Sequence, residues 1–213
     1  MFFELWTTYL SSFYSFEKAA VPKKKEESLL EEALRLEQAG DLAEALRKYE
    51  AALDGDGPAI LLLIGRLRLQ QGGVDSAIEA LRRAVEQGGG ALAHAYLGVA
   101  YLSKGALDQA AESLLQALAL DEALTPAQRS LGDVRFAQGR YLEAAALFQQ
   151  VTRTSQATVD DLMALANCYF KAGLYEVARL GYEQTLKLVP AHQVARENLA
   201  ATLEVIGQRT SAG

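Results

Sequence analysis

The fold is decided by the stretch from Val159 to Pro190, which reads VDDLMALANCYFKAGLYEVARLGYEQTLKLVP. In its first half, apolar residues follow one another at intervals of three or four, the spacing of one face of an α-helix. Gly173 interrupts this pattern, and glycine is the residue best suited to the left-handed cap of a helix. A second helical pattern runs from Tyr175 to Pro190, where proline cannot continue a helix. The stretch therefore predicts a helix, a tight turn and an antiparallel helix.

The same arrangement recurs along the chain at a nearly constant interval. Glycines recur every 32 to 34 residues, at Gly40, Gly72, Gly105, Gly139, Gly173 and Gly207. An alanine and then a large apolar residue follow the first five glycines, as Ala45 and Tyr49, Ala77 and Leu81, Ala110 and Leu114, Ala144 and Phe148, and Ala178 and Tyr182. Small residues precede the glycines, at Ala33, Gly65, Gly98, Gly132, Ala166 and Ala200. Small residues let two helices approach closely, and a large residue fills the space beside them. Repeats of this length indicate a solenoid, in which each hairpin buries the apolar face of the next.

These residues resemble the tetratricopeptide repeat (TPR) family over about residues 26 to 207. The resemblance is strongest in the pairs Leu97-Gly98 and Leu131-Gly132, in Tyr101 and Tyr169, and in turns such as Gly139 to Ala144. It implies an all-α fold, a right-handed α-solenoid of about five helix–turn–helix units with a C-terminal capping helix. The chain departs from the family at the early tryptophan, which every repeat lacks, at Glu32 in place of a leucine, and at Arg68 and Arg135 in place of a tyrosine.

The chain divides into segments of different composition. We expect an amphipathic, aromatic-rich docking helix over residues 1–20, a charged linker over 21–27, the solenoid over 26–207 and a tail over 208–213. Within the solenoid, the expected repeats span about residues 26–57, 58–90, 91–124, 125–158 and 159–190, and a capping helix spans 191–207. Polar residues of this last helix are suited to covering the final apolar face.

The first 20 residues place their large apolar side chains on one helical stripe: Phe2, Leu5, Trp6, Tyr9, Leu10, Phe13 and Phe16. The run is shorter than the ~20 residues that a spanning helix needs, and no basic residue precedes it as in a secretion signal. Burying seven such side chains would contribute on the order of 10 kcal/mol before ordering costs, so we expect the stripe to dock. Three docking surfaces stay open: the end of its own solenoid, the groove of a partner protein, and the membrane interface.

Composition and charge narrow the class of partner. The net charge is −6 and the pI about 5.1, which disfavours nucleic acid because phosphate binding needs a basic face. Cys168 is the only cysteine, so no disulfide within the chain is expected and a reducing compartment fits. We expect a cytoplasmic protein, either unattached or peripheral on the cytoplasmic face of a membrane or within a membrane-associated complex. The oligomeric state does not follow from the sequence.

Groups capable of catalysis are sparse. His94 and His192 are nearly a hundred residues apart, and no Cys or His cluster shows metal-ligand spacing. No glycine-rich loop carries a phosphate-binding lysine, and Asp160-Asp161 is interpreted as first-turn helix charge. The sequence therefore predicts no enzyme, no cofactor and no metal.

The resemblance implies that the first helices of successive repeats line a concave groove that binds a protein or peptide. Carried over by position, the predicted groove residues are Leu62, Arg66, Leu69, Val99, Arg129, Asp133, Phe136, Met163, Asn167, Phe170 and Lys171. Phe136 and Phe170, with Arg129 and Lys171 nearby, would suit a peptide with apolar anchors and an acidic group. The lysine position of the family's carboxylate clamp holds Leu30, Leu62, Ala95 and Met163, which argues against chaperone-tail binding by that route.

Two functions follow as alternatives. The first is a non-catalytic interaction scaffold or adaptor, whose groove recruits a partner while the N-terminal helix tethers it to a complex or a membrane. The second is a structural subunit built permanently into a larger assembly.

Overall fold

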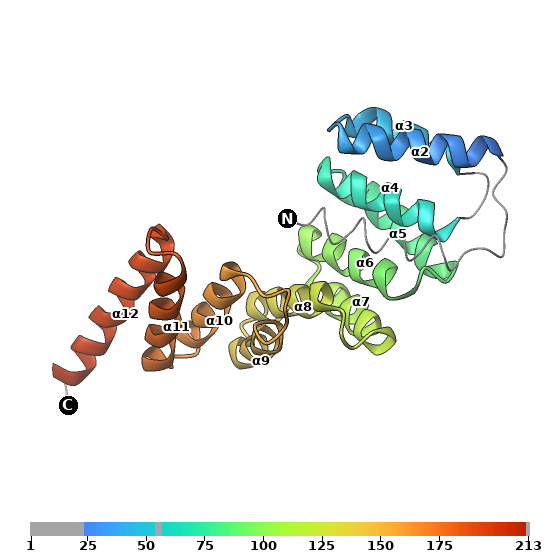
Figure 1. Cartoon of the computed structure of the whole chain (residues 1–213). Coiled ribbons are helices and arrows are strands. Elements are labelled where there is room, and N and C mark those ends of the chain that lie inside the picture. Colours follow the sequence, from blue (N-terminus) through green and yellow to red (C-terminus); the bar gives the residue numbers. More distant parts are fainter. Residues whose placement is uncertain (1–23, 54–56, 212–213) are drawn as a thin grey trace.

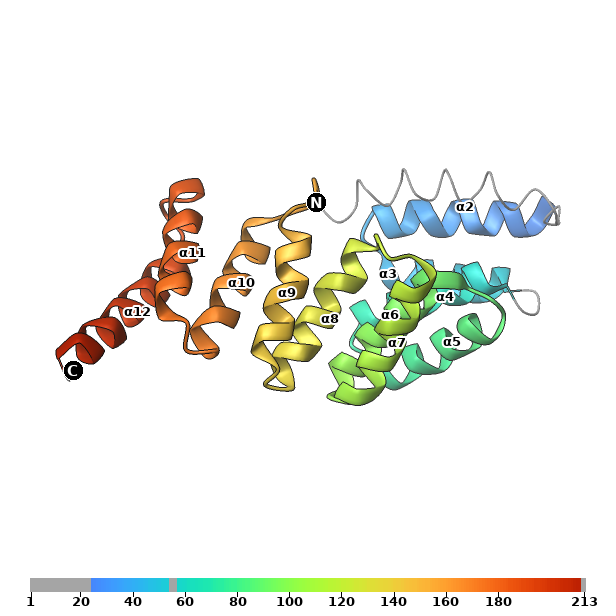
Figure 2. The same cartoon turned by 90° about the horizontal axis from the view of Figure 1, so that it is seen from below.

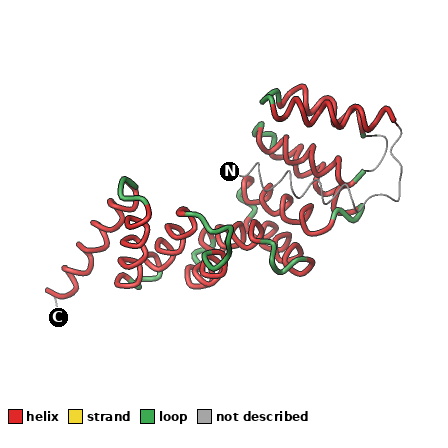
Figure 3. The backbone as a smooth tube through the Cα atoms, viewed as in Figure 1, coloured by secondary structure: helices red, strands yellow, loops and turns green. Residues whose placement is uncertain are grey.

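The computed structural model describes residues 24–53 and 57–211, and these residues form eleven helices and no strand (Figures 1 and 3). The predicted docking helix over residues 1–20 lies outside the described residues. The helices are α2 (Lys24–Gln38), α3 (Leu42–Ala52), α4 (Pro58–Gln70), α5 (Val74–Glu86), α6 (Gly90–Lys104), α7 (Leu107–Leu120), α8 (Thr125–Ala137), α9 (Tyr141–Val151), α10 (Val159–Lys171), α11 (Tyr175–Leu188) and α12 (Gln193–Ser211). Five antiparallel helix pairs and one further helix thus follow one another along the chain, and the predicted all-α solenoid is confirmed.

The turn inside each pair has the geometry that its glycine predicts. At the end of α6, Gly105 has a φ of 78°, a left-handed conformation that only glycine adopts without strain. Its N–H donates to the Leu102 carbonyl, and the next N–H, of Ala106, donates to the Tyr101 carbonyl. The corresponding glycines of the other four pairs have φ between 75° and 83°. The same tight turn is therefore built five times.

The core of each pair depends on the close approach of its two helices. The alanines and large apolar residues that recur in the second helices are all buried. A Cβ atom added to Gly65 would lie 2.4 Å from Leu81 Cγ, one added to Gly98 would lie 2.5 Å from Leu114 Cγ, and one added to Gly132 would lie 2.8 Å from Phe148 Cε2. No side chain fits at these three positions without moving its neighbour.

The fifth pair reaches the same closeness in a different way. Its first helix carries Ala166 where the second to fourth pairs carry glycine. Opposite it, on α11, stands Gly181, where an added Cβ would lie 2.8 Å from the Ala166 Cβ. In this pair the glycine lies on the second helix and not on the first, and the two backbones still pack closely.

The stacking direction leaves the first helices on the inner side of the bend. Each helix packs against the next in sequence, and in addition α4 contacts α6 and α6 contacts α8. No contact of similar extent joins α5 to α7 or α7 to α9 among the described residues. Helices α4, α6 and α8 are therefore closer together than α5, α7 and α9, and they line the inside of the arc in Figure 1, which Figure 2 shows from below.

Polar contacts repeat between neighbouring pairs. Lys104 Nζ, at the end of α6, lies 2.8 Å from Asp75 Oδ1, at the start of α5. One repeat later, Gln138 Nε2 donates to Asp108 Oδ1 at 3.0 Å. Both contacts join the end of a first helix to the start of the preceding second helix. Because they lie on the surface, each is expected to align neighbouring repeats more than to stabilise them.

The close approach of the helices can be tested with Gly98→Ala. We expect the free energy of unfolding to fall by up to about 2 kcal/mol, because overpacking costs ~1–3 kcal/mol and the gain in helix propensity offsets ~1 kcal/mol of this. Urea denaturation followed by far-UV circular dichroism measures the change. In the control Gly207→Ala, the new Cβ would meet no atom within 4 Å, so the protein should be as stable as the wild type or more stable. Equal stability of both variants would contradict this account of the core.

Candidate binding groove

Three positions on each first helix, taken from the predicted groove residues and their equivalents in the other repeats, define what we call the first-helix face. Its members are Leu30, Leu34 and Glu37 on α2; Leu62, Arg66 and Leu69 on α4; Ala95, Val99 and Leu102 on α6; Arg129, Asp133 and Phe136 on α8; Met163, Asn167 and Phe170 on α10; and Glu197, Ala201 and Glu204 on α12. All the predicted groove residues belong to this face except Lys171, which is the neighbour of Phe170. That these residues contact a ligand remains a prediction.

The first-helix face changes character along the solenoid. From α2 to α6 it is apolar, apart from Glu37 and Arg66. From α8 to α12 it carries charges and amides among its apolar residues, and Asp133, Glu197 and Glu204 are exposed. A ligand that spans the whole face would thus meet an apolar surface first and a polar, acidic one second.

The charges in the apolar half are bound within the protein. The Arg66 guanidinium donates to Glu37 Oε1, and the Tyr49 hydroxyl donates to Glu37 Oε2 at 3.1 Å. Both members of the pair are buried, at 8% exposure for Arg66 and 7% for Glu37. A buried pair of this kind costs desolvation that its Coulomb energy only offsets, so its main effect is to fix how α2, α3 and α4 sit together.

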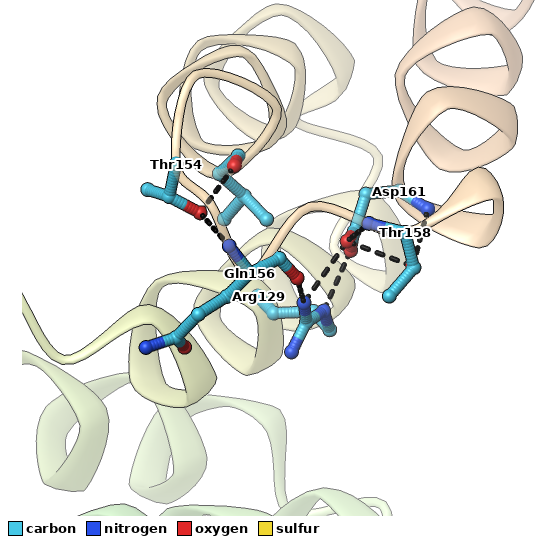
Figure 4. A network of polar contacts seen from close by, with 6 residues as sticks. Arg129, Thr154, Gln156, Thr158 and Asp161 are labelled. Carbon is cyan, nitrogen blue, oxygen red and sulfur yellow. Dashed lines mark hydrogen bonds and ion pairs between the residues drawn. The ribbon is translucent and has the colours of Figure 1, made fainter. Parts of the chain in front are cut away.

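Arg129 and Asp161 form a second link, between α8 and α10 (Figure 4). Arg129 Nε donates to Asp161 Oδ1 at 2.6 Å, and its Nη2 donates to Oδ2 at 2.9 Å, so the pair is bidentate. Arg129 Nη2 also donates to the Gln156 carbonyl at 3.3 Å. Asp161 accepts two further bonds from Thr158, one from its N–H and one from its hydroxyl, in the capping box of α10.

The surroundings of Asp161 set its protonation. Burial alone would raise the pKa of this carboxyl, but the hydrogen bonds from Arg129 and Thr158 outweigh burial and hold the pKa below its ordinary value. A lowered carboxyl pKa stabilises the fold above the ordinary pKa of 3.8, and this contribution is lost as the pH falls through the folded-state pKa. The positive charge of Arg129 is therefore paired with Asp161 within the protein. Of the predicted basic groove residues other than Arg66, only Lys171 remains exposed for an acidic ligand.

Asp133 is in the opposite situation. It lies one turn after Arg129 on the first-helix face and has an exposed surface, yet the neighbouring first helices remove much of the water around its carboxyl. This loss of hydration raises the pKa of Asp133 to about 6, and the negative charge of Asp161 adds to the rise while Arg129 opposes it. A raised carboxyl pKa makes the fold less stable as the pH rises from 3.8 towards 6. A group that costs stability near neutral pH is typical of a binding surface.

Asn167 connects three helices at the polar end of the face. Its Oδ1 accepts one bond from the Tyr182 hydroxyl of α11 at 2.7 Å and one from Asn198 Nδ2 of α12 at 3.0 Å. In this arrangement the amide oxygen faces α11 and α12. Among the described residues, no hydrogen bond donated by Asn167 Nδ2 is found. The amide N–H₂ can therefore donate to a ligand.

Phe136 and Phe170 have structural partners as well as exposed surface. Phe136 meets Tyr141 edge-on, with ring centroids 5.3 Å apart, and Phe170 meets Tyr175 in the same way at 5.3 Å. Each pair closes the turn between the two helices of one repeat. Both phenylalanines remain partly exposed, so they can contact a ligand only with the part of the ring that the tyrosine leaves uncovered.

Sequence reasoning missed the partners that determine the charge of the face. Glu37 and Asn198 were not expected in the groove, and Asp161 was interpreted only as a first-turn helix charge. The capping box of Thr158 and Asp161 was visible as a threonine followed three residues later by an acid. The bond of Asp161 to Arg129 depends on the stacking of two repeats and has no local signal.

Other groups in the described part of the chain offer little chemistry. Cys168 is buried, and burial raises the pKa of its thiol to about 12, which disfavours the reactive thiolate. No group of three or more His, Cys, Asp or Glu residues within residues 24–53 and 57–211 is placed to hold a metal ion. None of the described helices combines the length and the apolar character that crossing a membrane requires.

The repeats also match a known family model. The model of the tetratricopeptide repeat matches residues 30–91, 62–125 and 129–193, which is well over half of the chain. The chain belongs to the tetratricopeptide repeat family. Members of the TPR family bind protein or peptide partners and are in general non-catalytic. No curated protein matches the sequence.

Several solved TPR structures are similar to this chain. The crystal structure of MamA is 22% identical, has a TM-score of 0.68, and is matched over 77% of this chain and 91% of MamA. A thermophilic TPR protein from Thermus thermophilus is 25% identical, with a TM-score of 0.64 over 84% of this chain and 98% of its own. YrrB, described as a TPR protein with an unusual peptide-binding site, is 21% identical, with a TM-score of 0.67 over 79% and 89%. At this level of identity the likeness supports the fold.

The link between α8 and α10 predicts a pH-dependent stability. In Arg129→Met, Asp161 stays buried without its cation, so we expect the free energy of unfolding at pH 7 to fall by about 2–4 kcal/mol. The pKa of Asp161 should then rise above its ordinary value, so the loss should grow as the pH increases beyond 3.8. Urea denaturation between pH 4 and pH 7 measures both effects.

Two controls separate this pair from general effects of removing an arginine. The double variant Arg129→Met/Asp161→Asn should recover part of the loss, because no unpaired charge remains buried. Arg179→Met removes an exposed arginine that pairs with Glu176 and Glu183 on the surface of α11, and should change stability little. A pH-independent loss in Arg129→Met would contradict the assignment.

Proposed function

We propose that the protein is a non-catalytic scaffold or adaptor that binds a protein or peptide segment along its first-helix face. The observation that carries this proposal is the state of Asn167 and Asp133. One is an amide oriented by two helices, and the other is an exposed carboxylate with a raised pKa, and both lie on the inner surface of a TPR solenoid. Asp133 is exposed and outside the core, and Asn167 links three helices through its oxygen while its N–H₂ is left for another partner, so ligand binding is a role that fits both.

The chemistry of these residues describes the partner. Asn167 can donate to a backbone or side-chain carbonyl, as an extended segment would offer at regular intervals. Asp133 would accept from a basic side chain or a backbone N–H, and Lys171 would attract an acidic group. Phe170, which is partly exposed, would supply apolar contact. We therefore propose a segment with an apolar anchor and charges of both signs, in place of a purely acidic peptide.

We further propose that residues 1–20 form the docking helix of the scaffold, joined by the linker 21–27 to the solenoid of residues 26–207. In this proposal the stripe from Phe2 to Phe16 tethers the scaffold to a complex or to the cytoplasmic face of a membrane. Support comes from the amphipathic pattern and from the three adjacent lysines, residues 23–25, which would add attraction to anionic headgroups. We propose a reducing compartment such as the cytoplasm, which the single cysteine of the chain supports.

A second candidate is favoured by the last repeat. Exposed large apolar residues gather on α11 and α12 and in the loops around them: Leu174, Val177, Leu180, Leu188, Val189, Val194 and Leu203. Apolar surface of this extent suits a permanent contact, as in a structural subunit of a larger assembly. Sedimentation of the purified full chain discriminates the two candidates. A monodisperse monomer at rising concentration supports the exchangeable scaffold, and aggregation without a partner supports the permanent subunit.

The groove proposal is tested by Asp133→Asn and Lys171→Ala. Affinity purification with the wild-type chain identifies the partner, and calorimetry with the purified partner should show an approximately tenfold loss for each variant, about 1.4 kcal/mol. Wild-type affinity should also weaken as the pH falls through about 6, because protonated Asp133 no longer attracts a cation. Gln116→Ala and Gln149→Ala change exposed residues of the second helices and serve as controls. Equal affinity of all four variants would refute the groove.

The tether is tested by comparing the full chain with a variant that lacks residues 1–20. We expect the full chain to fractionate with a complex or with membranes, and the shortened chain to lose this association while it keeps its groove partner. Cell fractionation and co-purification measure the two properties separately. Identical fractionation and identical partners for both chains would refute the tether.

A further inference from the structure

The apolar half of the first-helix face is unusual for a surface that faces solvent. Helices α4 and α6 read PAILLLIGRLRLQ and GALAHAYLGVAYLSK, so they are apolar on nearly all sides and not on one side only. Part of this apolar surface packs into the core, but Leu69, Val99 and Leu102 lie on the inner face and remain partly exposed. A helix that is apolar all round is expected to be covered on all sides. Residues 61–67 of α4 are already buried, so the surface that an apolar partner would cover consists of Leu69, Val99 and Leu102, with Leu30 and Leu34 of α2.

The end of the solenoid at α2 offers no such surface. In α4, Ile60, Ile64 and Leu67 form the stripe that packs towards the preceding repeat, and they join the core there. The equivalent residues of α2 are Ser28, Glu32 and Arg35, and all three are exposed. The equivalent stripes of α6, α8, α10 and α12 are buried or half-buried, so α2 alone has a polar edge among the described first helices. This edge already ends the solenoid and has little apolar surface for another helix.

The chain itself carries a segment of the right length close to this face. Residues 1–20 would span about 30 Å as a helix, and packed helices lie about 8–10 Å apart, so such a helix can cross three first helices. Three residues, 21–23, separate the segment from the start of α2, and they reach about 10 Å. Its stripe of seven large apolar side chains needs an apolar partner, and the inner face of α2, α4 and α6 provides one within reach.

We propose that residues 1–20 lie across the first-helix face of α2, α4 and α6 of their own chain, with the stripe from Phe2 to Phe16 against Leu34, Leu69 and Val99. The segment then covers the apolar half of the groove and leaves the half from α8 to α12 open to a partner. The consequence of this inference, which is control of how much of the groove a partner can reach, rests on the proposed function. When the segment is drawn away to a complex or membrane, the apolar half becomes available and the groove lengthens.

The only tryptophan of the chain, Trp6, lies in the stripe and reports on its position. In the full chain alone, we expect a blue-shifted Trp6 emission and weak quenching by acrylamide. Val99→Asp should shift the emission to the red and increase the acrylamide quenching constant severalfold. Tyr9→Asp/Phe13→Asp should do the same from the side of the segment, without any change in the solenoid. Far-UV circular dichroism verifies that the solenoid stays folded.

Matched variants and conditions identify the surface. Ala201→Asp introduces the same charge at the equivalent position of α12 and should leave Trp6 shielded. Arg35→Asp alters the end of the solenoid and should also have no effect. Release of Trp6 by Arg35→Asp but not by Val99→Asp would overturn the proposal in favour of an end cap. Shielding that disappears on dilution would overturn it in favour of a second copy of the chain.

Lipid is tested in the same assay. Trp6 that is exposed in the full chain and becomes shielded only with vesicles of phosphatidylcholine and phosphatidylserine would overturn the proposal, whereas shielding without vesicles supports it. None of these measurements involves a groove partner. The self-docked segment can therefore fail while the groove still binds, and the groove can fail while the segment stays docked.

Discussion

The structure depends on the close contact between the two helices of each repeat. Gly65, Gly98 and Gly132 have no room for a Cβ, because the large side chain of the facing helix occupies that volume. This contact fixes the distance and the angle within each pair, and the same pair is then repeated with small changes. Because first helices are closer to one another than second helices, the stack bends and acquires an inner face. The binding surface is thus a consequence of packing far from it.

The two arginines of the inner face form ion pairs that join neighbouring repeats. The charged residues that form no such pair are the ones that indicate which ligand the face could bind. Arg66 and Arg129 are each bound to a carboxylate of a neighbouring repeat, so two apparent anion-binding residues are structural links. Asp133 has a raised pKa, because the loss of hydration around its carboxyl outweighs the attraction of Arg129. The face therefore presents the exposed carboxylates of Asp133, Glu197 and Glu204 and the amide of Asn167, with Lys171 at its edge. A charged side chain that already forms an ion pair within the protein is not available to a ligand, so these pairs determine which ligand charges the face can bind.

Much of the fold could be predicted from the sequence, since its signals are local and repeated. The first five recurring glycines lie in turns, and the alanines and large apolar residues that follow them are buried, whereas Gly207 lies within α12. The polar contacts that replace missing family residues could not be predicted, because they join residues of neighbouring repeats that are distant in sequence. Arg68 replaces the usual tyrosine of the family and binds Glu50 of the preceding repeat at 2.8 Å, whereas Tyr101 at the same position accepts a bond from Arg82 at 2.7 Å. The groove was predicted in outline only, for the same reason: its residues could be placed, but their partners could not.

The two ends of the solenoid differ in a way that bears on its assembly. At α2, exposed Ser28, Glu32 and Arg35 replace the apolar stripe of the later repeats, so this end resists further stacking. At α12, Val194 and Leu203 remain about half exposed, and the helix continues to Ser211. One end is therefore closed by charge while the other still carries apolar surface. An additional helical element would add at α12, and a partner that binds the acidic half of the groove would lie beside that surface. The exposed charges of the first-helix face and the exposed apolar residues of the last repeat thus lie at the same end of the molecule, from α8 to α12.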